Sequence, residues 1–499
     1  MRVIYITTPI YYPNSDPHIG TAYTTCIADF LSRYYKMKNY DVFFLTGNDE
    51  NSVKVEEAAR KANKETKEYV DQMAILFKDI WNKLYIEYDK FIRTTDEEHV
   101  RTATYVFQKL FEEGYIYKSF YEGWYCKNCE TFWPKSKVGE DKKCPNVECQ
   151  RELEWLKEDN YFFKLSAFQD RLIEFYENNP DVIFPKARYN EVLSFIKMGL
   201  QDISVSRKNV EWGIKVPFDK EYTIYVWIDA LTNYITGIGY PDNFKAHYWE
   251  NVHHIMGKDI IRFHAVIWPS ILMALKLPLP KKIIAHGWLI TASKEKISKS
   301  KGGDIFNLKD FVFSNPPHLI MALRYYLLRE GSFGEDIPVS LERFTQIYNS
   351  ELANNFGNLV SRVLAIIQKN LDGQVYKQTD ISSLANIIDS FTSKYYNYVE
   401  NYEFSKALEM VVEIANILNK KIEENKPWEI NDREKLNNLM FELIFGIVNI
   451  AKLLYPALPY TSKKILEQIG LSSFDTNIEK VEIKYREALF PTIKNIVKT

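Results

Sequence analysis

The sequence has little cysteine and almost no net charge, and each of these features argues against a class of protein. Its 499 residues include five cysteines, too few for a disulfide framework in so long a chain. In a reducing compartment, a group of cysteines is more often metal-binding or catalytic. The formal net charge is -2, so no global attraction draws the chain to nucleic acid or to an acidic membrane. Any polyanion would have to be held by a local basic patch.

Long apolar runs are also missing. No stretch approaches about 18 uncharged apolar residues, and the N-terminus lacks the cationic and apolar regions of a secretion signal. Internal repeats and low-complexity segments are absent from the sequence as well. We therefore expect a cytoplasmic protein without membrane contacts. The chain ends at Thr499, soon after the last helical pattern, with no appended domain evident, and we expect a monomer.

The sequence does contain an alternation of strand and helix patterns. Residues 3–8 are rich in β-branched and aromatic side chains, residues 19–34 place apolar side chains at helical spacing, and residues 42–45 form a second apolar run. Strand, helix and strand within about fifty residues indicate the βαβ unit of a nucleotide-binding parallel sheet. Further strand-like runs lie at residues 223–228, 254–256 and 283–285.

The length of the chain predicts about two to four domains. The composition and residue pattern of the sequence change twice along it. After Gly114, aromatic, cysteine and turn residues become dense, which indicates an insertion. From about Leu341 to Leu466 the periodicity is almost wholly helical, which predicts a helical bundle. We expect an α/β fold with a Rossmann-like parallel sheet split by the insertion. The predicted divisions are residues 1–115 and 221–322 for the two halves of the sheet, 116–220 for the insertion, 323–345 for a linker and 346–499 for the bundle.

Four of the five cysteines lie in the insertion as two pairs. Two residues separate Cys126 from Cys129, and four separate Cys144 from Cys149. Four thiolates supply a closed tetrahedral zinc site, and such a metal organises a small segment that lacks a core of its own. No histidine lies within residues 100–246, so all four ligands would be cysteines. We predict one structural Zn2+ ion here, with reduced, metal-free cysteines as the alternative.

Two short stretches carry candidates for phosphate chemistry. His18, Gly20 and Thr21 stand where the first helical pattern begins, and the free N–H groups of a helix start favour an anion. Gly20 would let a flat ring or a phosphate approach the backbone closely. Residues 294–303, which read KEKISKSKGG, form a cationic loop suited to a polyphosphate. Taken singly, each stretch also has a plain structural explanation, a helix cap or a solvated charged surface.

These stretches occur together with further motifs in a fixed order. Residues 12–25 resemble the HIGH signature of class I aminoacyl-tRNA synthetases, and residues 285–303 resemble their KMSKS signature. Essentially the whole chain is similar to the methionyl-tRNA synthetase family. The further motifs are Thr46-Gly47-Asn48-Asp49-Glu50, Tyr225-Val226-Trp227-Ile228-Asp229-Ala230, Gly257-Lys258-Asp259 with Phe263-His264, Asn354-Asn355-Phe356-Gly357-Asn358 with Arg362, and Lys426-Pro427-Trp428.

The resemblance implies a methionine--tRNA ligase. Such an enzyme joins L-methionine and ATP into methionyl-adenylate, releases pyrophosphate, and transfers the methionyl group to the 3′ end of tRNA(Met), with Mg2+ accompanying ATP. Displacement at the α-phosphorus needs little covalent help, so positioning and charge stabilisation carry it. The implied catalytic residues are His18, Gly20, Thr21, Lys296 and Lys299, and the implied ATP-binding residues are His18, Gly20, Thr21, Gly257, Asp259, His286, Gly287, Trp288, Ile297 and Lys299.

The resemblance also assigns a methionine pocket and makes the helical bundle an anticodon-binding domain. Methionine is unbranched and its polarizable sulfur packs well on aromatic rings, so its pocket should be aromatic with a carboxylate for the ammonium group. Unstacked anticodon bases are held by aromatic stacking and by hydrogen bonds from Asn and Arg. The implied residues are Ile10, Tyr12, Asp49, Trp227, Ala230, Tyr234, Ile260 and His264 for methionine, with Asp49 at the ammonium group, and Asn358, Arg362 and Trp428 for the CAU anticodon.

The chain departs from the family pattern at three places. Thr21 replaces the second histidine of HIGH, Ile297 replaces the methionine of KMSKS, and Asn51-Ser52 stands where His-Gly often follows Asp-Glu. Isoleucine for methionine conserves volume and should matter little. Thr21 keeps a hydroxyl donor but loses an imidazole, so we expect a weaker contact with ATP. The sequence itself offers no physical account of Asn51-Ser52.

Three other classes of protein fit part of the sequence. A HxGH-type nucleotidyltransferase also handles ATP at a His-x-Gly-His turn, but it would not need the helical domain. Another class I aminoacyl-tRNA synthetase is a nearer alternative, although the Leu, Ile and Val enzymes bring a large editing insertion for which the stretch between the sheet halves is too short. A zinc-ribbon nucleic-acid module without catalysis would leave His18 and the lysine loop without a function.

Overall fold

The structure, a computed structural model, describes residues 2–126, 131–133, 138–145, 149–208, 210–291, 307–378 and 380–493. The chain forms two compact units, each built from separate stretches of sequence. Unit 1 comprises Met1–Asp16, Asn39–Leu76 and Tyr88–Ala285, and unit 2 comprises Pro17–Lys38, Phe77–Glu87 and His286–Thr499.

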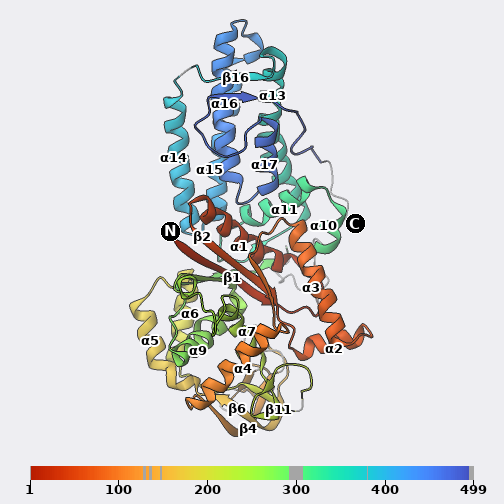
Figure 1. Cartoon of the computed structure of the whole chain (residues 1–499), viewed down its shortest axis with the longest axis vertical. Coiled ribbons are helices and arrows are strands. Elements are labelled where there is room, and N and C mark those ends of the chain that lie inside the picture. Colours follow the sequence, from red (N-terminus) through yellow and green to blue (C-terminus); the bar gives the residue numbers. More distant parts are fainter. Residues whose placement is uncertain are drawn as a thin grey trace. The chain divides into compact units, whose positions relative to one another are not determined.

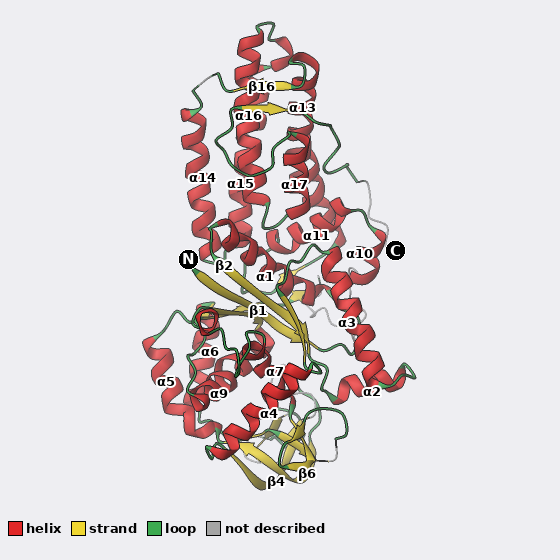
Figure 2. Cartoon of the chain, in the orientation of Figure 1, coloured by secondary structure: helices red, strands yellow, loops and turns green. Residues whose placement is uncertain are grey.

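A six-stranded sheet forms the centre of unit 1, with its strands yellow in Figure 2. The strand order is β3-β2-β1-β12-β13-β7, and β1 pairs in parallel with both β2 and β12. Parallel strands are usually buried on both faces, and Tyr5 and Ile6 of β1 are fully buried. The predicted parallel sheet is confirmed. The strands are β1 (Val3–Tyr11), β2 (Asp41–Asn48), β3 (Lys90–Arg93), β7 (Ile183–Phe184), β12 (Val252–Gly257) and β13 (Lys282–His286).

Amphipathic helices complete the core of unit 1. In α4, the residues Ala103, Val106, Phe107 and Leu110 repeat at helical spacing and are all fully buried. Helix α7 packs against α4 and β1. The helices that begin in this unit are α2 (Val53–Lys61), α3 (Thr66–Lys83), α4 (Glu97–Glu112), α5 (Gln169–Asn178), α6 (Lys186–Lys197), α7 (Val226–Thr236), α8 (Ala246–Trp249) and α9 (Trp268–Leu275), with short turns η2 (Leu165–Phe168), η3 (Lys258–Ile260) and η4 (Phe263–Ile267).

The range expected as an insertion builds antiparallel sheets of its own. Strands β4 and β6 pair along most of their length within the sheet β5-β4-β6-β8, and a second sheet has the order β10-β11-β9. Strand β7, from the same range, joins the central sheet beside β13. The strands are β4 (Ile116–Cys126), β5 (Thr131–Trp133), β6 (Glu154–Phe163), β8 (Ile203–Ser204), β9 (Ser206–Lys208), β10 (Lys215–Val216) and β11 (Asp219–Ile224).

The strand expected at residues 223–228 is wrong in its second half, and its first half, at the end of β11, lies in the antiparallel sheet β10-β11-β9 and not in the central sheet. Strand β11 ends at Ile224, and helix α7 begins at Val226 after the extended residue Tyr225. A short apolar run cannot be assigned to a strand or to a buried helix by periodicity alone. Helix α7 is such a buried helix, since the run from Ile228 to Ile235 is buried throughout.

Unit 2 contains α1 and the helical bundle, which confirms the predicted helical domain. The apolar spacing that predicts α1 matches its buried face, and α11 packs against both α1 and α15. Helices α14, α15, α16 and α17 pack in sequence order, α14 on α15, α15 on α16 and α16 on α17 (Figure 1). The elements are α1 (Ile19–Met37), β14 (Leu289–Ile290), α10 (Leu308–Ser314), α11 (Pro317–Arg329), β15 (Ile337–Pro338), α12 (Leu341–Ile347), η5 (Tyr348–Gly357), α13 (Asn358–Asn370), β16 (Gln374–Tyr376), α14 (Ser382–Glu400), α15 (Phe404–Asn425), η6 (Pro427–Glu429), α16 (Arg433–Leu454), α17 (Pro459–Gln468) and β17 (Lys480–Glu482).

Helix α16 is long and apolar enough to cross a membrane by length and composition alone. Within the bundle, however, 83% of its most apolar window is buried against protein. The apolar surface of α16 is therefore used as the core of the helical domain.

Candidate active site

The His18 side chain caps the N-terminus of α1. Its Nδ1 accepts a hydrogen bond from the Gly20 N–H at 3.0 Å, so the neutral imidazole carries its proton on Nε2. The Thr21 hydroxyl completes a capping box, accepting from the His18 N–H at 3.0 Å and donating to the His18 carbonyl at 2.6 Å. A Cβ atom at Gly20 would lie 2.8 Å from His18 Cε1, so only glycine admits this ring position.

His286, which belongs to unit 2 and precedes the lysine loop, contacts the first turns of α1. The Thr24 hydroxyl and His286 Nε2 are 2.7 Å apart, and the rings of Tyr23 and His286 are 4.7 Å apart between centroids. His286 Nδ1 donates to the Gly287 carbonyl at 2.7 Å, which leaves Nε2 to accept from Thr24. Trp288 donates its backbone N–H to Asp336 at 2.8 Å. Unit 2 therefore brings the predicted ATP-binding residues of the first and last motifs close together.

The predicted lysine residues themselves fall outside the described part of the chain. Lys296, Ile297 and Lys299 lie between Thr291 and Asn307, where the described residues stop and resume. Their assignment therefore remains a prediction.

The residues predicted to bind methionine gather at the carboxyl ends of parallel strands in unit 1. Ile10 is the penultimate residue of β1, and Tyr12 directly follows its end at Tyr11. Strand β2 ends just before Asp49. In open α/β sheets, ligands bind in the crevice outside these strand ends. Trp227, Ala230 and Tyr234 follow one face of α7 at intervals of three and four residues. Ile260 and His264 follow the end of β12.

A chain of hydrogen bonds fixes the polar end of this group. His264 Nδ1 donates to the Ile260 carbonyl at 3.0 Å, so its Nε2 accepts the Tyr234 hydroxyl proton at 2.6 Å. Burial lowers the pKa of His264 to about 4, and burial also raises the pKa of Tyr234 well above its usual value, with smaller contributions from Tyr11 and Asp49. Both side chains are therefore uncharged at neutral pH.

Three residues that pack beside these hydrogen bonds were not among the predicted site residues: Phe263, His254 and Trp268. Phe263 stacks on Trp227 with 3.3 Å between ring centroids and 9° between planes. The Trp268 indole donates to His254 Nε2 at 3.2 Å, and the His254 ring lies 4.4 Å from that of Tyr234. Phe263 stands directly before His264 in the motif, but His254 and Trp268 give no sequence signal beyond that of ordinary core residues.

Asp49 lies in a buried turn that its neighbours hold in place. Its backbone N–H donates to the Tyr11 carbonyl at 3.0 Å, and the Asp49 side chain is buried. The next residue, Glu50, forms an ion pair with Arg93 at 2.7 Å. Burial raises the pKa of Glu50, and hydrogen bonding and charge from Arg93 oppose this rise. The turn therefore presents a buried carboxylate at the end of β2.

The other predicted residues of unit 1 are more open. Gly257 ends β12, and Asp259 is exposed in η3. Tyr12 is half-buried, with the Lys54 ammonium 5.8 Å from its ring centroid.

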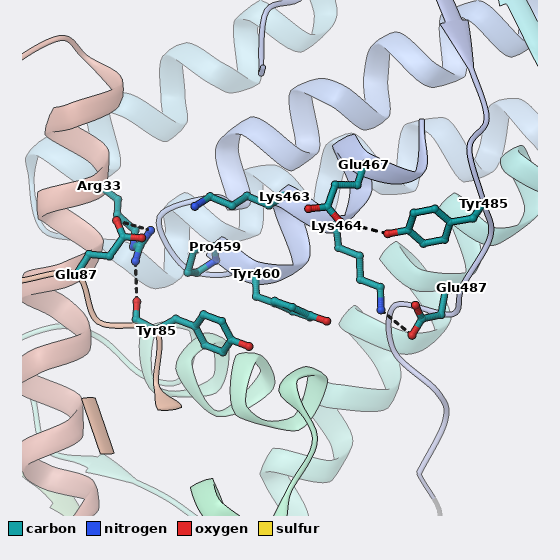
Figure 3. A pocket seen from close by; sticks show the side chains of 10 residues that line it. All are labelled: Arg33, Tyr85, Glu87, Pro459, Tyr460, Lys463, Lys464, Glu467, Tyr485 and Glu487. Atoms are coloured by element: carbon teal, nitrogen blue, oxygen red, sulfur yellow. Dashed lines mark hydrogen bonds and ion pairs between the residues drawn. The ribbon is translucent and has the colours of Figure 1, made fainter. Parts of the chain in front are cut away.

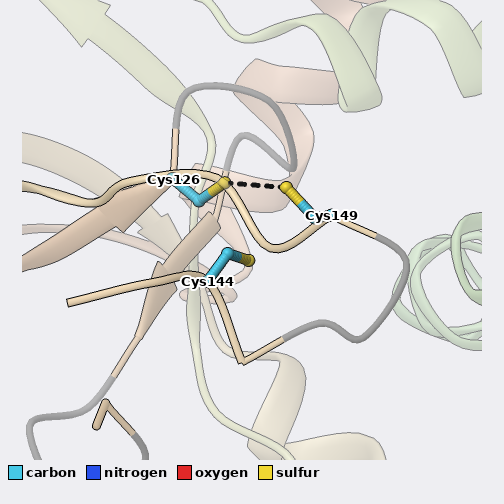
Figure 4. Close-up of side chains that lie close together, drawn as sticks. All are labelled: Cys126, Cys144 and Cys149. Atoms are coloured by element: carbon cyan, nitrogen blue, oxygen red, sulfur yellow. Dashed lines mark hydrogen bonds between the residues drawn. The ribbon is translucent and has the colours of Figure 1, made fainter. Parts of the chain in front are cut away.

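Three of the four predicted metal ligands converge in the insertion. The ligand atoms of Cys126, Cys144 and Cys149 all lie within 4.8 Å of one another, and the Cys126 and Cys149 sulfurs are 3.5 Å apart (Figure 4). Thiolates bound to one tetrahedral ion at about 2.3 Å lie about 3.8 Å apart, so this group fits a metal ion. Cys129, the fourth predicted ligand, lies outside the described residues. The four-residue spacing of the second pair is compatible with convergence.

Two of the three predicted anticodon residues form a contact in the helical domain. The Arg362 guanidinium lies 5.9 Å from the centroid of the Trp428 ring, which is 57% exposed and thus open to a stacked base. Asn358 lies one turn before Arg362 at the start of α13 and is exposed.

A separate cavity of about 310 Å³ opens in unit 2 (Figure 3). None of the predicted site residues lines it. Two of its cationic side chains already face carboxylates, Lys464 at 2.7 Å from Glu487 and Arg33 at 3.3 Å from Glu87. Its lining residues are Arg33, Tyr85, Glu87, Pro459, Tyr460, Lys463, Lys464, Glu467, Tyr485 and Glu487.

Comparison with known proteins identifies the family. The model of the family "tRNA synthetases class I (M)" matches residues 4–364, and that of the "Anticodon-binding domain of tRNA ligase" matches residues 383–499. The chain is 44% identical to a methionine--tRNA ligase of Caldanaerobacter subterraneus, over 99% of this chain and 79% of that protein. This chain belongs to the methionyl-tRNA synthetase family.

Other members of the methionyl-tRNA synthetase family agree in sequence and in structure. A methionine--tRNA ligase of Thermotoga maritima is 42% identical over 93% of this chain and 75% of that protein. The solved Mycobacterium tuberculosis methionyl-tRNA synthetase in complex with methionyl-adenylate is similar with a TM-score of 0.91 and 34% identity, covering 98% of this chain and 100% of that one.

Proposed function

We propose that this chain is a methionine--tRNA ligase, which forms methionyl-adenylate from methionine and ATP and then charges tRNA(Met). The observation that carries the proposal is the uncharged pair of Tyr234 and His264 at the carboxyl ends of the strands. With Trp227 stacked on Phe263 nearby, this surface suits a thioether, and the uncharged Tyr234 and His264 side chains would not form an ion pair with a charged side chain. Asp49 is the proposed partner of the ammonium group.

In the first step, a carboxylate oxygen of methionine attacks the α-phosphorus of ATP, and the bond to pyrophosphate breaks. His18 would donate from Nε2 to an α-phosphate oxygen, since the helix cap holds the proton on that nitrogen. The N-terminus of α1 adds positive potential at the same place. Lys296 and Lys299 would stabilise the leaving pyrophosphate, and Mg2+ bound with ATP would neutralise part of its charge.

In the second step, a hydroxyl of the terminal ribose of the tRNA attacks the carbonyl carbon of the adenylate, and AMP leaves. Anticodon recognition selects the tRNA. Trp428 would stack on an unpaired base, while Arg362 and Asn358 would donate hydrogen bonds to base edges.

The remaining parts of the proposal concern the metal ion, the oligomeric state and the location of the protein in the cell. Zinc is the ion that best matches a group of thiolates in a segment with a small core, where Cys126 and Cys144 pack with Leu153. Its role would be structural, because it would hold the end of β4 to the loop that follows β5. We also propose a monomeric, cytoplasmic protein, as the sequence predicts.

Charging assays with two transcripts test the proposed function. Purified protein supplied with ATP, Mg2+ and methionine should form methionyl-adenylate and then charge a tRNA(Met) transcript. A matched transcript with one anticodon base changed should be charged at least about 10-fold less efficiently, since each stacked or hydrogen-bonded base contributes about 1–3 kcal/mol. Failure to form methionyl-adenylate would overturn the function, whereas equal charging of both transcripts would overturn only the anticodon role.

A further inference from the structure

A buried cluster of polar side chains links three elements around the predicted methionine residues. Asp229, on α7, is fully buried, and each of its carboxylate oxygens has a different donor. His99 Nε2, from α4, donates to Asp229 Oδ1 at 2.7 Å. Asn51 Nδ2, from the turn after β2, donates to Asp229 Oδ2 at 2.9 Å. One carboxylate thereby ties α7 to α4 and to the turn after β2.

The same turn carries Asp49, and further hydrogen bonds make it rigid. Asn51 Nδ2 also reaches the Thr94 carbonyl at 3.1 Å, and the Glu50 N–H donates to the Thr94 hydroxyl at 2.9 Å. The Trp212 indole donates to the Glu50 carbonyl at 2.7 Å. The position of the Asp49 carboxylate is thus set by the residues directly after it.

Helix α7 carries the opposite part of the predicted pocket. Asp229 lies between Trp227 and Ala230, and Tyr234 follows five residues later on the same helix. A shift of α7 would move the aromatic residues, and a shift of the turn would move Asp49. Because Asp229 joins the two, its hydrogen bonds determine the distance between the ammonium partner and the side-chain pocket.

We infer that Asn51, Asp229 and His99 are positioning residues that set the methionine pocket of this enzyme. They act through Asp49 and α7 rather than by touching substrate. This inference rests on the proposed function and accounts for one departure from the family pattern. Asn51 supplies a donor where histidine is common in relatives, and Ser52 caps α2 by accepting from the Val55 N–H at 3.3 Å.

A negative charge at position 51 should disrupt this arrangement. Asn51→Asp would remove the donor and place a second carboxylate against Asp229. The titratable or charged groups around this position are Asp49 and Glu50 on the turn, Arg93 on β3, His99 on α4 and Asp229 on α7. Two facing carboxylates raise the pKa of one of them, and its protonated form is again a donor. The defect of this variant should therefore shrink as pH falls.

Methionine-dependent exchange of pyrophosphate into ATP tests the inference, with KM values for methionine and for ATP measured for each variant. Asn51→Asp should raise the KM for methionine about 10-fold to 100-fold, the effect of losing a hydrogen bond to a buried charge. The KM for ATP should stay within about 2-fold. Asn51→His should stay within about 3-fold of wild type for both, since it restores a donor. Asn63→Asp, the same change at an exposed position after α2, is the matched control.

A second pair of variants examines the other donor. His99→Gln keeps an N–H near Asp229 Oδ1 and should retain most of the methionine affinity, whereas His99→Leu should lose it. Thermal unfolding of each variant separates positioning from misfolding. Equal rises in both KM values together with a lower unfolding temperature, or an Asn51→Asp variant that behaves like Asn63→Asp, would overturn the inference. Wild-type protein without methionine-dependent exchange would instead overturn the proposed function.

Discussion

A buried ion cluster in unit 2 makes one residue of α1 unusually sensitive to substitution. Asp29 is fully buried, and its Oδ2 accepts from Arg33 Nε at 2.8 Å and from Arg324 Nη2 at 2.6 Å. Its Oδ1 accepts the Glu87 N–H at 2.8 Å. Arg324 continues to the Ala457 carbonyl at 3.0 Å, at the joint between α16 and α17. The cluster therefore connects α1, the helix capped by His18, to α11 and to the helical domain.

Asp29→Asn should destabilise this unit by about 3–5 kcal/mol, because it leaves two buried guanidinium groups facing a neutral amide. The side-chain volume is nearly unchanged, so the loss is electrostatic and not a packing defect. For domains of about 150–250 residues, 1 kcal/mol shifts the unfolding midpoint by about 2–4 °C. The midpoint should therefore fall by about 6–20 °C.

Thermal unfolding followed by circular dichroism and calorimetry measures this effect. The matched control is Asp372→Asn, which removes an aspartate from an ion pair with Arg433 whose side chains are 80% and 67% exposed. An exposed pair contributes about 1 kcal/mol or less, so the control should shift the midpoint by less than about 4 °C. If the unfolding midpoint of Asp29→Asn falls no further than that of Asp372→Asn, the buried ion cluster does not stabilise the unit.

Four further outcomes are expected. Burial raises the pKa of Asp29, but Arg33 and Arg324 lower it more, so the pKa lies below its usual value. The difference in unfolding free energy between wild type and Asp29→Asn should therefore be full above about pH 4 and shrink as the pH falls further. A difference that stays constant in urea titrations across this pH range would contradict the prediction. Trp428→Ala should lower charging of tRNA(Met) about 10-fold while sparing methionine-dependent exchange, and equal loss of both would indicate misfolding. Cys144→Ser should reduce bound zinc from one ion per chain to well below one in metal analysis; full retention would exclude this ligand. Lys299→Ala should slow single-turnover adenylate formation about 100-fold with little change in methionine affinity, and an unchanged rate would remove its catalytic role.

Local patterns in the sequence were enough to predict α1, the parallel strands at the start of the chain and the helical domain. The spacing of apolar residues decides these elements, because each buries one face or one run of side chains. The same reasoning was wrong at residues 226–228, because a short, continuously apolar run can belong either to a buried strand or to a buried helix. The helix cap at His18 explains Thr21 as the partner in a capping box.

The contacts around Asn51 could not be predicted from the sequence. Its partners stand 43 and 178 positions away, and neither distance leaves a periodic pattern. The same holds for His254 and Trp268, which pack against Tyr234 as members of distant elements. Motif matching found residues assigned to substrate, but it did not reveal the residues that hold them.

The most direct test of the proposed function is amino-acid-dependent exchange of pyrophosphate into ATP, measured with each of the twenty amino acids in turn. An uncharged pocket formed by Tyr234 and His264, with Asp49 for the ammonium group, predicts strong exchange with methionine and little with any other amino acid. Exchange that is stronger with another amino acid, or absent with methionine, would contradict the account.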